Sequence, residues 1–76
     1  MRTVVMVDAV PGYEAAVEAR LRGLYGVRAI RRGKRGNFDL AVLLETADRG
    51  EVERWINNEA RLVTGVRCVQ WGPRAN

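Results

Sequence analysis

The stretch FDLAVLLE, residues 38–45, is apolar on both faces of the strand that it predicts. Successive side chains of a strand point to opposite faces, so Phe38, Leu40, Val42 and Leu44 oppose Ala41 and Leu43. The stretch TVVMVDA, residues 3–9, has the same property, with Val4 and Met6 on one face and Val5, Val7 and Ala9 on the other. A strand that is apolar on both faces belongs inside a sheet. We therefore expect both strands to be central.

The chain repeats itself at an offset of 39 residues. YGVRAIR (25–31) matches TGVRCVQ (64–70), and Glu14 matches Glu53. Each half reads as strand, helix, strand. The second strand of each half, VRAIRR or VRCVQW, carries an arginine among its apolar residues, as is typical of strands at a sheet edge. The sequence thus predicts one unit used twice.

Two segments have helical periodicity. In residues 12–24, the apolar stripe that faces the core is formed by Tyr13, Val17, Leu21 and Leu24, and Glu18 and Arg22 form an i,i+4 pair on the side that faces water. In residues 49–63, Asp48 and Glu51 have the spacing of a capping box, and the residues expected to face the core are Val52, Trp55, Ile56, Leu62 and Val63. We expect Gly26 and Gly65 to supply the left-handed residue that ends each helix.

Right-handed crossovers and a hairpin at residues 31–37 join these units into an α+β fold. We predict one ferredoxin-like βαββαβ domain over residues 1–76, with a four-stranded antiparallel sheet in the order 4-1-3-2 and both helices on one face. The other face is apolar and has no cover from this short chain. Exposed apolar patches of this kind mark protein interfaces. We therefore expect a homodimer, a dimeric α/β-barrel assembly, over the alternative of a monomer that tolerates the patch.

Composition limits the function classes. No apolar run approaches the roughly 18 residues of a membrane span, and the N-terminus lacks the pattern of a signal peptide, so we expect a cytoplasmic protein without membrane contact. A single cysteine, Cys68, and the absence of histidine weigh against metal sites and cofactors, and we expect Cys68 to be a small core residue. The net charge of +4 is uneven, because residues 20–35 hold seven basic residues and no acid.

The segment RRGKRGNFDL, residues 31–40, has several interpretations. It is a charged hairpin turn in which Asp39 begins a strand. As an RNA-recognition strand it begins correctly with Arg35 and Gly36, but Asn37 occupies an aromatic position and only Phe38 could stack on a base. An enzyme would need a carboxylate or phenol with a tuned pKa, and the candidates (Asp8, Asp39, Glu45 and Tyr13) form no recognisable constellation. We expect Asp8, at the end of the first strand, to be a turn or helix-entry residue, and we expect no catalytic residues.

Most of the chain resembles the C-terminal effector-binding (RAM) domain of the Lrp/AsnC family. The residues that carry the resemblance are Pro11-Gly12-Tyr13-Glu14, Gly26-Val27, Gly36-Asn37-Phe38-Asp39-Leu40, Asp48 and Gly65-Val66. The G-x-aromatic-D-L turn is the most specific of them. Members of that family typically carry an N-terminal helix-turn-helix, dimerise through their sheets, often form octamers, and bind amino acids at contacts between dimers. Since the first strand begins at Thr3, the chain resembles the stand-alone version, and we expect no direct DNA binding.

The resemblance implies a domain that senses an amino acid or similar small metabolite, oligomerises, and is linked to transcription regulation of metabolism through partner regulators such as full-length Lrp/AsnC proteins. The implied ligand-binding residues are Gly36, Asn37, Phe38, Asp39, Thr64, Gly65 and Val66. Glycine lets backbone N–H groups reach a ligand carboxylate, and Asp39 offers an acceptor for its ammonium group. The alternatives are a small dimeric α/β-barrel enzyme and a peptide-binding chaperone.

Overall fold

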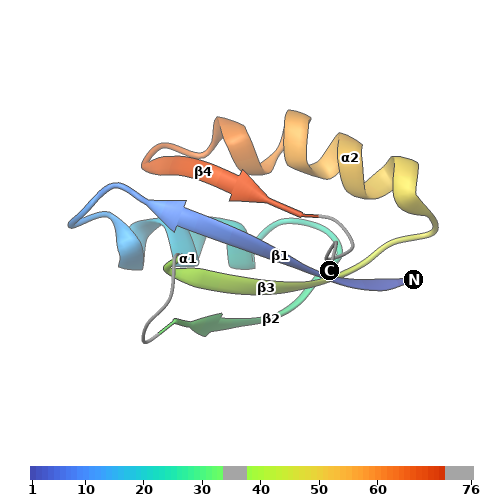
Figure 1. The fold of residues 1–76 in the computed structure, drawn as a ribbon, viewed down its shortest axis with the longest axis horizontal. Helices are drawn as coiled ribbons and strands as arrows, with labels where there is room; N and C mark the ends of the chain where they lie inside the picture. The colour runs from blue at the N-terminus through green and yellow to red at the C-terminus, as the bar shows by residue number, and fades with distance from the viewer. Residues whose placement is uncertain (34–37, 72–76) are drawn as a thin grey trace.

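A computed structural model describes residues 1–33 and 38–71 (Figure 1). The elements, in chain order, are β1 (Arg2–Ala9), α1 (Glu14–Arg22), β2 (Val27–Arg32), β3 (Leu40–Glu45), α2 (Arg49–Asn58), the 3-10 helix η1 (Ala60–Leu62) and β4 (Val66–Gln70). None of the helices in this part of the chain is long and apolar enough to cross a membrane.

The four strands form one antiparallel sheet in the order β2-β3-β1-β4, which is the predicted order read from the opposite edge. β1 and β3 are central, and they pair in register from Arg2 opposite Glu45 to Val7 opposite Leu40. The predicted ferredoxin-like fold class is therefore confirmed. The end of β1 lies between the start of β3 and the start of β4, which brings residues distant in sequence to the same end of the sheet (Figure 1).

One core fills the space between the sheet and both helices. Its buried members are Val5, Val7, Ala9, Val17, Leu21, Ile30, Leu40, Val42, Leu44, Val52, Trp55, Ile56, Ala60, Val63 and Val69. Since these include alternate residues of β1 from Val5 to Ala9, alternate residues of β3 and the buried residues of both helices, α1 and α2 cover the same face of the sheet. The alternate residues of β1 and β3 face away from the helices.

Both edge strands contain a bulge at the same place in the repeated unit. Arg28 is the extra residue between Val27 and Ala29 in β2, and Arg67 is the extra residue between Val66 and Cys68 in β4. A bulge interrupts the strict alternation of side chains. Val27 and Ile30 therefore both pack on the core in β2, and their counterparts do so in β4.

The helices begin and end inside the predicted limits. α1 starts at Glu14 and ends at Arg22, and Tyr13 stands at its N-cap with 45% of its surface exposed, so the prediction of Tyr13 as a core residue is wrong. Gly26 and Gly65 have the predicted positive φ, 92° and 97°, but neither is the residue that ends a helix, because α1 ends at Arg22 and η1 ends at Leu62.

The capping box of α2 is confirmed. The Asp48 carboxylate accepts from the Glu51 N–H at 2.9 Å, and the Glu51 carboxylate accepts from the Ala47 N–H at 2.7 Å. The predicted helix continues to residue 63, but α2 ends at Asn58 and is followed by η1. This change of helical period turns Leu62 outward, where 73% of it is exposed, so its assignment to the core is wrong.

Candidate ligand-binding site

Asp39, directly before β3, is fixed by three hydrogen bonds. Its carboxylate oxygen Oδ2 accepts from the Ala9 N–H at 2.8 Å. Its own N–H donates to the Val7 carbonyl at 3.1 Å, and its carbonyl accepts from the Gly33 N–H at 2.7 Å. The half-buried side chain therefore binds the end of β1, opposite the bulge of β4, and keeps a carboxylate at the rim of the sheet.

The second predicted segment, residues 64–66, lies on the other side of β1. The Gly65 carbonyl accepts from the Val10 N–H at 2.8 Å. Consecutive N–H groups of an extended chain point in opposite directions, so Ala9 binds Asp39 on one side and Val10 binds Gly65 on the other. The structure thus brings the described members of the predicted site, Phe38, Asp39, Thr64, Gly65 and Val66, to one end of the sheet.

Gly36 and Asn37, the other two predicted site residues, lie outside the described residues. Of the five that are described, Phe38, Asp39, Gly65 and Val66 are half-buried and Thr64 is exposed.

Tyr13 belongs to this end of the molecule and was not predicted there. A Cβ atom placed on Gly65 would come within 2.8 to 3.0 Å of three carbon atoms of the Tyr13 side chain. The tyrosine is therefore seated on the glycine backbone. Its spacing to Val17 and Leu21 indicated a core position, and only the pairing of Val10 with Gly65 places it beside residues 64–66.

Two other residues differ from their expected positions. Cys68 is exposed rather than part of the core. It lies opposite Asp8, on the sheet face away from the helices, because the bulge at Arg67 gives the core positions to Val66 and Val69. Asp8 itself is a strand residue within β1 rather than a turn or helix-entry residue.

Some of the basic residues between positions 20 and 35 form ion pairs with carboxylates from other parts of the fold. The Glu18 carboxylate accepts hydrogen bonds from Arg32 and Arg22, and these bonds lower the pKa of Glu18. Lys34 and Arg35 lie outside the described residues. Part of the positive charge of residues 20–35 is thus neutralised by carboxylates in the folded chain, which weakens the nucleic-acid interpretation.

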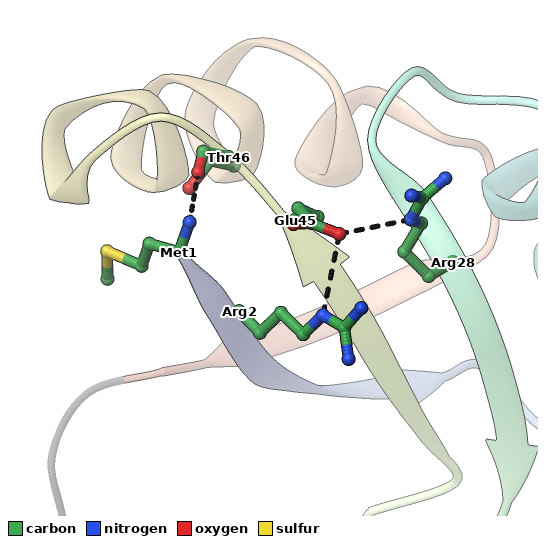
Figure 2. Close-up of polar contacts among 5 residues, drawn as sticks. All are labelled: Met1, Arg2, Arg28, Glu45 and Thr46. Carbon is green, nitrogen blue, oxygen red and sulfur yellow. Dashed lines mark hydrogen bonds and ion pairs between the residues drawn. The ribbon is translucent and has the colours of Figure 1, made fainter.

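Glu45 also pairs with two arginines, at the end of the sheet away from Asp39. Figure 2 shows its carboxylate between Arg28 of β2 and Arg2 of β1, with N–O distances of 3.2 and 3.5 Å. The hydrogen bond from Arg28 is the main cause of its lowered pKa. Beside this group the Met1 ammonium donates to the Thr46 carbonyl at 2.6 Å, so Met1 is also tied to this corner (Figure 2).

A cleft of about 320 Å³ opens between the end of α1 and α2. Its lining includes the polar residues Glu45, Thr46, Glu51, Arg54, Asn58 and Glu59. Two of its carboxylates are already engaged, Glu45 by arginines and Glu51 by the start of α2. Of the enzymatic candidates named from sequence, only Glu45 lines this cleft. Within residues 1–33 and 38–71, no three His, Cys, Asp or Glu side chains gather as metal ligands would.

No family profile matches the sequence, and no curated protein matches it. Solved structures do match its fold. The crystal structure of FFRP-DM1 superposes with a TM-score of 0.84 at 18% identity, covering 93% of each chain. TTHA0845 from Thermus thermophilus gives 0.83 at 18% identity, covering 99% of this chain and 95% of that one. The hypothetical protein PHS023 from Pyrococcus horikoshii gives 0.80 at 20% identity, covering 95% and 87%. The chain has a ferredoxin-like fold similar to that of FFRP-DM1.

Proposed function

We propose that this chain is a self-associating sensor domain that binds an amino acid or a similar small metabolite at the Asp39 end of its sheet. In this proposal two copies pack through the sheet face that the helices leave open, and ligand occupancy is passed to partner regulators of transcription. The resemblance of the sequence to the Lrp/AsnC effector-binding domain and the likeness of the fold to FFRP-DM1 support this function. The proposal involves no catalytic step.

The open sheet face is the observation that carries the proposal. Val4 lies beside Leu43, and Met6 lies beside Ala41, on the side of β1 and β3 away from the helices. Val4 is 47% exposed, and the other three are half-buried although no element of the described chain covers them. A continuous apolar surface on the two central strands loses its contact with water when a second copy packs on it.

The ligand assignment is supported by the chemistry at the end of β1. An amino acid needs an acceptor for its ammonium group and donors for its carboxylate. Asp39 offers the acceptor from a fixed position, with Oδ2 held by the Ala9 N–H. Backbone N–H groups of a glycine turn are suited to the carboxylate, and Gly36 is the proposed source.

Self-association is tested by light scattering. We expect a mass of at least twice 8.5 kDa at micromolar concentration. Val4→Lys should give a monomer, because it places a charge on the proposed contact. Leu62→Lys is the matched control, since Leu62 is also exposed but lies on η1. A wild-type monomer would remove the assembly half of the proposal.

Ligand binding is tested by thermal shift with the twenty amino acids. A ligand at 100 times its Kd stabilises the folded state by about 2.7 kcal/mol. Asp39→Asn is more informative than Asp39→Ala, because the amide oxygen still accepts from the Ala9 N–H while the charge is lost. We expect Asp39→Asn to fold and assemble but to lose the response. A full response in this variant would place the ligand elsewhere.

A further inference from the structure

We infer that the cleft of about 320 Å³ between the end of α1 and α2 is a second binding site, for a small, planar, uncharged molecule with a cyclic-amide edge. A cyclic-amide edge is a ring N–H beside a ring carbonyl, one donor next to one acceptor, as in uracil or hypoxanthine. The cleft includes Glu45 and Thr46 at the end of β3, so it lies at the end of the sheet away from Asp39. The inference is independent of the proposed function.

Trp55 contributes to this cleft a buried donor without a partner. Its side chain lines the cleft, and only 6% of the residue is exposed. Its indole nitrogen Nε1 has no hydrogen-bond partner within residues 1–33 and 38–71. Buried indole N–H groups normally donate to an acceptor, and that of Trp71 does so, to the Thr3 hydroxyl at 3.3 Å. A ligand carbonyl in the cleft would supply the acceptor that Trp55 lacks.

The charged side chains of the cleft favour a neutral ligand that also donates a hydrogen bond. Two carboxylates of the lining, those of Glu45 and Glu51, already have partners within the protein. Arg54 and Glu59 are exposed and form no ion pair within the described part of the chain. Their opposite charges balance, so unpaired charge in the cleft does not select an ion. Glu59, at the end of α2, offers a carboxylate acceptor for a ligand N–H.

The apolar and aromatic walls of the cleft suit a flat ring. Leu24 and Tyr25 line it on the α1 side, and Trp55 lines it on the α2 side. Aromatic side chains bind flat rings by offset or edge-to-face contact. Tyr25 is 89% exposed, so its ring gains contact when a ligand binds. A volume of about 320 Å³ is at the lower end of the range for ligand pockets, which suits a ligand of one or two rings.

The experiment is an NMR titration that follows the indole N–H signals of the two tryptophans. The signal that persists in Trp71→Phe is assigned to Trp55. We expect uracil or hypoxanthine to move the Trp55 signal saturably to higher proton frequency, because its indole N–H gains an acceptor. The Trp71 signal should stay in place, since Thr3 already accepts from it. The matched control ligand is uracil methylated on both ring nitrogens, which keeps the carbonyls and has no N–H. Benzoate is the anionic comparison.

Variants test the acceptor and the aromatic wall. Glu59→Gln keeps the size of the side chain but loses the charge, and we expect it to weaken binding about tenfold, because hydrogen bonds to charged groups are the stronger ones. Glu53→Gln is the matched control, since Glu53 is an exposed glutamate of α2 that does not line this cleft. Tyr25→Ala should weaken binding about twofold to tenfold through the lost ring contact.

Binding of uracil or hypoxanthine, without binding of dimethyluracil, supports the inference. It is overturned if neither ligand moves the Trp55 signal, or if dimethyluracil binds equally well. Tighter binding of benzoate would indicate an anion site at Arg54 and also overturns it, as does an affinity that is the same in Glu59→Gln and Glu53→Gln. None of these results bears on the amino-acid response of Asp39→Asn, so the inference and the proposed function fail separately.

Discussion

At the scale of single residues, Gly65 is restricted twice, by its φ of 97° and by the Tyr13 side chain against it. Gly12 offers the matched comparison, because its φ is 93° but nothing lies within 4 Å of an added Cβ. Gly12→Ala should cost only the left-handed strain, about 1–2 kcal/mol. Gly65→Ala should cost about 1–3 kcal/mol more, because the ring must move. Urea denaturation measures both, and equal losses would show that the ring yields freely.

The carboxylates of Glu18 and Glu45 predict the pH dependence of stability. Hydrogen bonds from Arg32 and Arg22 lower the pKa of Glu18 in the folded state, and the bond from Arg28 does the same for Glu45. A lowered pKa stabilises the fold at pH values above the ordinary value of 4.5, and this stabilisation disappears as the pH falls through the folded-state pKa. We expect the urea midpoint to fall between about pH 6 and pH 3, and to fall less in Glu18→Gln and Glu45→Gln. A steeper fall in these variants would contradict the assignment.

The position of Asp39 shows what sequence reveals about a single residue. The start of a strand close to Asp39 was predictable from local chemistry. Its hydrogen bond to the Ala9 N–H was not, because that bond joins residues 30 positions apart and forms only when β1 and β3 pair. The same reason hid Tyr13, whose contact with Gly65 depends on the pairing of β1 with β4.

At the scale of elements, alternation predicted the central strands correctly and failed at the edge strands. β1 and β3 pair in register without interruption, so period two holds along their whole length. β2 and β4 each contain a bulge at an arginine, Arg28 and Arg67. The repeat GVRAI and GVRCV carries this arginine in both halves, but a repeat in sequence does not by itself indicate a bulge. The exposed position of Cys68 follows from it.

The cap at the start of α2 predicts how substitutions of Asp48 change stability. The Asp48 side chain accepts from the Glu51 N–H, one of the donors that a helix leaves unpaired at its start. Asp48→Ala should lower the free energy of unfolding by about 1 kcal/mol, whereas Asp48→Ser keeps an acceptor and should lower it by less. Glu53→Ala, an exposed change within α2, is the control. Urea denaturation of the wild type and these variants at neutral pH measures the free energies of unfolding. Equal losses in the alanine and serine variants would argue against the cap.

At the scale of the whole molecule, the strand order was predictable because so few arrangements satisfy the apolar patterns. Two strands that are apolar on both faces must be central, and two strand–helix–strand units with right-handed crossovers then place both helices on one side. The ligand end was only partly predictable. The segments around Asp39 and Gly65 came from the resemblance, and their meeting at the end of β1 came from the strand order.

Because the helices cover only one face of the sheet, we expect stability to depend on protein concentration. If the open face is covered by a second copy, folding and association are coupled, and mass action stabilises the folded dimer. A tenfold higher concentration then adds about 1.4 kcal/mol per dimer. We expect the thermal midpoint of the wild type and of Leu62→Lys to rise with concentration, and that of Val4→Lys to stay constant. Because this measurement follows folding rather than mass, a constant midpoint in the wild type would show that Val4, Met6, Ala41 and Leu43 tolerate water in a stable monomer.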